Sequence, residues 1–181
     1  MTRWPSAALL LCAMAAAGVA PGQSPQIRLS ATGSASSEAP QIRLSASGTF
    51  ILPVDAGLSL LKQCSRDAPD RVSQFWSPSA AQIGRLERLL PQYVHAGSDP
   101  RRHVPGNVEY HRQYVGIVVE GRRLIYGNFY PASTFQPVGA MARFDEKSTP
   151  VVVCDGGPSF WGVVFDPAAD VFVDLQVNGP V

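Results

Sequence analysis

Residues Tyr114 to Tyr130, YVGIVVEGRRLIYGNFY, decide the fold class of this chain. The flanks, Tyr114–Val119 and Leu124–Tyr130, are rich in β-branched and aromatic side chains, which favour strands. Glu120-Gly121 lies between them, so the stretch predicts a β-hairpin. Apolar residues fill alternate and intervening positions of both strands, which predicts a sheet covered on both faces or one that presents an apolar patch to a partner.

Three downstream segments also have the composition of strands. Val151–Cys154 is a short β-branched run. Phe160–Phe165 and Val171–Val177 flank the turn-forming sequence Asp166–Asp170, so they predict a second hairpin. Together with the first hairpin, the sequence predicts about five strands.

Two helices are predicted upstream of these strands. Asp55 is suited to cap a short helix, and Ser77-Pro78 supplies the cap and first residue of a second helix that ends or kinks near Pro91. The prediction is therefore an α+β domain in which two N-terminal helices pack on one face of an antiparallel sheet of about five strands. The apolar stripe of the second helix would consist of Ile83, Leu86, Leu89 and Leu90.

The N-terminal residues have the pattern of a secretory signal peptide. Arg3 precedes an apolar run rich in Ala and Leu, and small residues follow, which predicts a signal peptide over residues 1–22 with cleavage after Ala20 or Gly22. Cys12 also allows a lipoprotein interpretation, but Leu11 stands where a small residue is expected. No later segment is long and apolar enough for a spanning helix, so we predict no transmembrane segment in the mature chain and a periplasmic or extracellular location.

A short duplication follows the predicted signal peptide. PQIRLSATG begins at Pro25 and PQIRLSASG begins at Pro40, and two copies are too few for a solenoid. We predict a mostly disordered tether over residues 23–48, whose second copy could add an edge strand through Ile42 and Leu44, and a single compact domain over residues 49–181.

Charge and cysteine usage limit the classes of partner. The chain has 15 basic and 14 acidic residues, and without Arg3 the two numbers are equal, so no nucleic-acid partner is predicted. Removing Cys12 with the signal peptide leaves Cys64 and Cys154, which predict one disulfide in an oxidising compartment. A metal or redox pair is the alternative, but no C-x-x-C spacing or neighbouring histidine supports it.

Three longer stretches carry a resemblance to a known family. They are FWSPSAAQIGRLERLLPQYV from Phe75, YHRQYVGIVVEGRRLIYGNFYP from Tyr110, and VVVCDGGPSFWGVVFDPAADVFVDLQVNG from Val151. In these stretches the chain resembles a family of small exported bacterial proteins of unknown function. The resemblance implies export and the extent of the domain, and it implies no activity.

No catalytic or metal-binding pattern stands out. His95, His103 and His111 are spaced by eight residues, which matches neither a helical metal site nor a zinc finger, and no metal or cofactor is predicted. Ser159 lacks the final glycine of a nucleophile elbow, because Trp161 occupies that position. The sequence leaves one enzymatic alternative, a hydrolase using His103 or His111 with an aspartate such as Asp155.

The preferred functional prediction is a non-enzymatic module that binds a protein or an envelope component. Aromatic and arginine side chains are enriched at binding hot spots, although buried packing is the more usual role of such aromatics. Arg112, Arg122 and Arg123 flank the first hairpin and could also bind an anion, although exposed arginines at strand ends are more often only solvated. The binding residues predicted on these grounds are Tyr114, Tyr126, Trp161 and Arg112.

Overall fold

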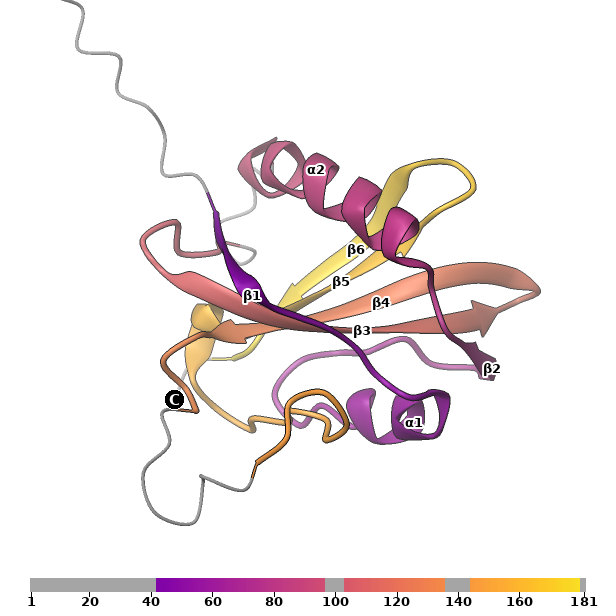
Figure 1. Ribbon diagram of the computed structural model, residues 1–181, viewed down its shortest axis with the longest axis horizontal. Helices are drawn as coiled ribbons and strands as arrows, with labels where there is room; N and C mark the ends of the chain where they lie inside the picture. Colours follow the sequence, from indigo (N-terminus) through magenta and orange to yellow (C-terminus); the bar gives the residue numbers. More distant parts are fainter. Residues whose placement is uncertain (1–41, 97–102, 136–143, 180–181) are drawn as a thin grey trace, which may run out of the picture. The chain divides into compact units, whose positions relative to one another are not determined.

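The structure, a computed structural model, describes residues 42–96, 103–135 and 144–179 (Figure 1). The predicted signal peptide and residues 23–41 of the predicted tether lie outside the described residues. The first strand begins at Arg43, inside the segment predicted as a tether, and it contains Leu44. No helix among the described residues has the length and apolar character needed to cross a bilayer.

A mixed sheet of six strands forms the centre of the fold. The hairpin predicted from Tyr114 to Tyr130 is confirmed, because β3 pairs antiparallel with β4 from Tyr110–Pro131 to Val119–Arg122. The sheet order is β1-β3-β4-β5-β6, with β2 also paired to β3. The strands are β1 (Arg43–Ile51), β2 (Val72–Trp76), β3 (Glu109–Val119), β4 (Arg122–Pro131), β5 (Trp161–Asp166) and β6 (Val171–Val177).

Strands β1 and β2 share the outer edge of β3. β1 runs parallel to β3 against Glu109–Tyr114, whereas β2 runs antiparallel to β3 against Gly116–Val119. The remaining neighbours, β4–β5 and β5–β6, are antiparallel. β3 and β4 are therefore central strands, which agrees with their nearly continuous apolar sequences.

Helix α2 (Ala80–Ala96) covers one face of the sheet, called here the α2 face (Figure 1). Ile83, Leu86 and Leu90 of α2 are buried in the cluster on this face, as their helical spacing predicts. Pro91 lies inside α2, so the helix continues past it to Ala96. The sheet side of this cluster includes Tyr110, Tyr114, Ile125, Phe129, Trp161, Val163, Phe165 and Leu175.

The opposite face of the sheet, called here the α1 face, has a different cover. The short turn η1 (Val54–Ala56) and the four-residue helix α1 (Gly57–Leu60) follow β1 and lie on this side (Figure 1). Leu52 and Leu60 are almost completely buried there against sheet residues. The sheet contributes Val115, Ile117, Leu124, Tyr126 and Val164.

The predicted fold class is wrong in three respects. The sheet is mixed rather than antiparallel, because β1 adds in parallel to β3. Two N-terminal helices on one face are not found in the described chain: α1 has only four residues, and α1 and α2 lie on opposite faces. In chain order, β1 precedes both helices and β2 lies between them. Both strands pair with β3, which lies far along the chain, and local periodicity cannot reveal such a distant partner.

The predicted strand Val151–Cys154 is also wrong, and side-chain amides explain why. Gln113 Oε1 accepts a hydrogen bond from Val151 N–H at 2.8 Å, and Asn128 Nδ2 donates to the Val151 carbonyl at 2.9 Å. Asn178 Nδ2 donates to the carbonyls of Val153 and Asp155, at 2.8 and 2.9 Å. Buried side chains thus satisfy backbone groups that a neighbouring strand would otherwise bind.

The predicted disulfide between Cys64 and Cys154 is confirmed. Their Cα atoms are 4.8 Å apart, and the bond joins positions 90 residues apart in sequence. The bond joins the segment that follows α1 to the segment around Val151, whose backbone is bound by the buried amides. Figure 1 shows both segments on the α1 side of the sheet, so the disulfide links two parts of the cover of that face.

Candidate functional site

A pocket of about 340 Å³ lies where the end of β2, the first turn of α2 and the β5–β6 turn meet the start of β4. A volume of this size lies at the lower end of the range for small-molecule sites. The pocket is lined by Trp76, Gln82, Arg122, Arg123, Asp166, Pro167 and Ala168.

Trp76 forms the floor of the pocket because β3 carries a glycine beneath it. Trp76 pairs with Gly116, and a Cβ at Gly116 would lie 2.3 Å from atoms of the indole ring. The indole Nε1 donates a hydrogen bond to the Ile117 carbonyl at 3.1 Å. The ring is therefore fixed by both packing and a hydrogen bond.

Gln82 is positioned by the cap of α2. Gln82 N–H donates to Ser79 Oγ at 3.3 Å, while Gln82 Oε1 accepts from Ser79 N–H at 2.9 Å. This reciprocal arrangement is a capping box. The cap predicted at Ser77 therefore lies two residues later, at Ser79, and α2 begins at Ala80.

The two arginines of the pocket differ in their partners. Arg122 Nη2 donates to Asp166 Oδ2 at 2.7 Å, and this bond lowers the pKa of Asp166. Backbone N–H groups of Ala168 and Ala169 also bind Asp166 Oδ1 and act in the same direction. Asp166 is consequently an ionised carboxylate with one partner in β4 and two in its own turn.

Arg123 has no carboxylate partner in the described part of the chain. Its guanidinium carbon lies 4.0 Å from the centroid of the Trp76 ring, in a cation–π contact. Stacking uses the flat face of the guanidinium and leaves its N–H groups, which lie in the plane, available to an acceptor. An anionic group, above all a carboxylate, fits this arrangement chemically.

The four predicted binding residues are buried. Tyr114, Tyr126 and Trp161 are at most 2% exposed and Arg112 is 4% exposed. Tyr114 and Trp161 pack on the α2 face, whereas Tyr126 packs on the α1 face. In this structure they contact the interior of the domain, and their role in binding remains a prediction.

Arg112 is held by an ion pair in the interior. Its Nε donates to Glu87 Oε1 at 2.8 Å and its Nη2 donates to Glu87 Oε2 at 3.2 Å. Its Nη1 donates to the carbonyl of Ser45 in β1. Glu87 also accepts from Tyr114 Oη, so Arg112 joins β1, β3 and α2.

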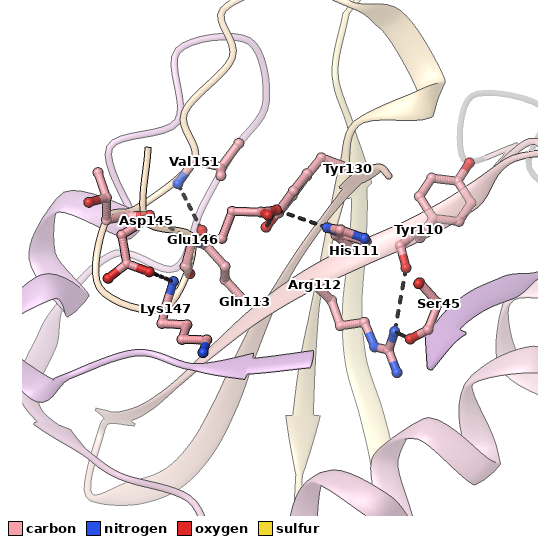
Figure 2. Close-up of polar contacts among 11 residues, drawn as sticks. Ser45, Tyr110, His111, Arg112, Gln113, Tyr130, Asp145, Glu146, Lys147 and Val151 are labelled. Atoms are coloured by element: carbon pink, nitrogen blue, oxygen red, sulfur yellow. Dashed lines mark hydrogen bonds and ion pairs between the residues drawn. The ribbon is translucent and has the colours of Figure 1, made fainter. Parts of the chain in front are cut away.

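A second polar cluster surrounds His111 on β3 (Figure 2). His111 Nδ1 lies 2.9 Å from Glu146 Oε1, and Tyr130 Oη donates to the same oxygen at 2.8 Å. Burial raises the pKa of Tyr130, and the Glu146 hydrogen bond and charge act in the same direction. His111 and Glu146 are each about one-fifth exposed.

The histidines of the hydrolase hypothesis are thus placed as follows. His111 has a glutamate, Glu146, as its carboxylate partner rather than an aspartate. His103 is exposed, and Asp155 is exposed with its backbone carbonyl bound by Asn178. Across residues 42–96, 103–135 and 144–179, no three His, Cys, Asp or Glu side chains converge as a metal site would require.

Sequence reasoning recognised Arg122 and Arg123 as anion-binding candidates but missed the rest of the pocket. Trp76 meets Arg123 only because β2 and β4 lie on opposite sides of β3. The SPSAAQ sequence at residues 77–82 contains the capping signal that positions Gln82. Nothing local to Asp166 indicates that it pairs with Arg122.

No protein-family model, curated protein or solved structure matches this chain.

Proposed function

We propose that the chain is an exported, non-enzymatic domain that binds a protein or envelope component in the periplasm or outside the cell. We further propose that the pocket around Trp76 and Arg123 takes a carboxylate group of that partner. The resemblance to small exported bacterial proteins of unknown function and the signal-peptide pattern support export.

The observation that carries the binding proposal is the position of Arg123. Holding the Arg123 guanidinium over Trp76 costs conformational entropy, because the long side chain loses rotamer freedom. Trp76 orients this group, and the ion pair between Arg122 and Asp166 leaves the Arg123 charge without a carboxylate counterion among the residues that line the pocket. The lining residues include no serine, cysteine or histidine, so the pocket is better suited to binding than to nucleophilic catalysis.

A titration with peptides of opposite charge tests this proposal. The isotope-labelled exported protein is titrated with a short oligoglutamate peptide and, separately, with oligolysine, while the Trp76 indole N–H resonance is followed. We expect saturable shifts with oligoglutamate only, and an affinity about tenfold lower for Arg123→Gln. The matched control is Arg88→Gln, which removes an exposed arginine of α2 outside the pocket.

Two outcomes would overturn the carboxylate site. One is no shift of Trp76 with oligoglutamate, and the other is equal loss of affinity in Arg123→Gln and Arg88→Gln, which would indicate general charge attraction. Export is tested separately by mass spectrometry of the N-terminus after cell fractionation. We expect a chain that starts at Pro21 or Gln23 outside the cytoplasm, and an intact cytoplasmic chain would contradict export.

A hydrolase that uses His111 is the alternative proposal, supported by the contact between His111 Nδ1 and Glu146. A carboxylate at Nδ1 orients the ring and leaves Nε2 to act as a base. This proposal predicts that His111→Ala abolishes hydrolysis of ester or peptide substrates by the purified protein, whereas exposed His103→Ala does not. Unchanged hydrolysis in His111→Ala would exclude this role of His111.

A further inference from the structure

The second copy of the duplicated sequence contributes to β1, and the first copy has nearly the same residues. Within the second copy, Pro40–Gly48, residues Arg43–Gly48 form the first part of β1. The first copy, Pro25–Gly33, differs from it at a single position, Thr32 in place of Ser47. Ser47 is exposed in β1, so the difference falls at a position that is not buried.

The contacts of the second copy show which residues a segment needs in order to pair with β3 at this position. Arg43 and Leu44 pair in parallel with Glu109 and Tyr110 of β3, and Leu44 and Ile42 pack against the α2-face cluster. The Ser45 carbonyl accepts a hydrogen bond from Arg112.

The position of Gly48 in β1 also restricts which residue can stand there. A Cβ at Gly48 would lie 2.3 Å from His111 Cδ2, so the position needs a glycine. The first copy contains every residue that these contacts use, at the same spacing: Ile27, Arg28, Leu29, Ser30 and Gly33.

The pairing of β1 with β3 is interrupted within the second half of the second copy. The register shifts between Leu44 and Thr49, which pair with Tyr110 and Arg112 respectively, so the strand is irregular there. Thr49–Ile51 pairs with Arg112–Tyr114 independently of the residues before the irregularity. Residues 34–48 could therefore loop out between Gly33 and Thr49, and the entropy cost of such a loop grows only slowly with its length.

We propose that the first copy is an exchangeable strand that takes the place of the second copy in β1 of the same molecule. The second copy is favoured in the native chain, because its use requires no additional loop. When the second copy is impaired, the first copy takes over its pairing with β3. The edge of β3 at Glu109–Tyr110 is thus a docking surface for two nearly identical segments of one chain.

Charge substitutions in the two copies test the exchange by thermal unfolding of the full exported chain. Leu44→Asp disables the second copy by placing a charge against the apolar cluster. We expect Leu29→Asp alone to leave Tm unchanged. The Leu29→Asp/Leu44→Asp chain should lose about 10 °C, and Leu44→Asp less than about half of that. Equal losses in Leu44→Asp and the double variant would overturn the proposal.

Cysteine pairing supplies a second readout that does not depend on stability. Arg43 pairs with Glu109, so an Arg28→Cys/Glu109→Cys chain should form an intramolecular disulfide when the first copy docks. We expect this crosslink to increase at least about fivefold when Leu44→Asp is added, because the competing copy is then disabled. No crosslink in that background, or crosslinks only between molecules, would overturn exchange within one chain. Arg43→Cys/Glu109→Cys is the positive control.

Discussion

Arg112 of β3 and Glu87 of α2 form a two-point ion pair in which Nε and Nη2 of the arginine each reach a different carboxylate oxygen. The Arg112 side chain is 5% exposed and that of Glu87 is 21% exposed, so the arginine is the more deeply buried partner. The pair connects the helix that covers the α2 face to a central strand. The pair also means that the buried positive charge of Arg112 is neutralised by Glu87.

Glu87→Gln should therefore destabilise the domain by about 3 kcal/mol, because Arg112 would keep its charge without a counterion. The free energy of unfolding in urea measures this change. Asp170→Asn is the matched control, since its partner Arg85 and Asp170 itself are both more than 40% exposed. We expect that control to change stability by less than about 0.5 kcal/mol. A loss below about 1 kcal/mol in Glu87→Gln would contradict the argument.

The Cys64–Cys154 disulfide should contribute about 4 kcal/mol to stability. It closes a loop of 90 residues, which restricts the unfolded chain strongly on the chain-entropy model. Urea unfolding of the native chain and of Cys64→Ser/Cys154→Ser compares the two states. Identical unfolding midpoints would show that the bond does not constrain the unfolded chain as this model requires.

Four buried tyrosines should make the protein unfold in alkali. Burial raises the pKa values of Tyr110, Tyr114, Tyr126 and Tyr130 above the ordinary value. A raised folded pKa means that the stabilising contribution is complete below the unfolded pKa of about 10 and is lost as pH rises above it. Each tyrosine contributes a slope of up to about 1.4 kcal/mol per pH unit.

The measurement is tyrosinate absorbance during an alkaline titration, together with circular dichroism. We expect the absorbance of these four residues to appear in the same transition as unfolding. Tyr110→Phe should reduce the pH slope of stability by about a quarter. Full tyrosinate absorbance while the native circular dichroism persists would contradict the prediction that these tyrosines ionise only on unfolding.

Two glycines should respond to alanine in opposite directions. A Cβ at Gly116 would meet the Trp76 ring at 2.3 Å and the Trp76 backbone oxygen at 2.5 Å, so Gly116→Ala should cost about 3 kcal/mol. A Cβ at Gly84 in α2 meets only the end of the Arg88 side chain, at 3.6 Å. Gly84→Ala should add about 0.5–1 kcal/mol, because alanine is the better helix former. Thermal unfolding of both variants checks the signs, and destabilisation by Gly84→Ala would contradict the space found there.

The sequence predicts those parts of the fold whose signals are local. The hairpin of β3 and β4, the apolar stripe of α2 and the disulfide all depend on periodicity, composition or count, and all are confirmed. Runs of β-branched and aromatic residues and helical spacing each lie within one segment, so one segment suffices to recognise them, whereas the disulfide follows from the number of cysteines.

The parts that could not be predicted depend on contacts between distant segments. β1 joins β3 in parallel although more than fifty residues separate them, and nothing in either strand encodes that partner locally. The pocket needs Trp76 and Arg123 to meet across β3. Val151–Cys154 has strand composition, yet Gln113, Asn128 and Asn178 bind its backbone instead.

These three amides have a consequence for how the chain can change in evolution or design. A strand in a sheet obtains its hydrogen bonds from backbone groups, so its side chains can be replaced with little effect on the ladder. The segment around Val151 obtains most of them from the side chains of three particular residues, each at most 2% exposed. The tolerance of this segment to substitution is therefore set elsewhere in the chain, at positions 113, 128 and 178. A redesign that keeps every residue of the segment but changes one of these amides would remove hydrogen bonds from its backbone.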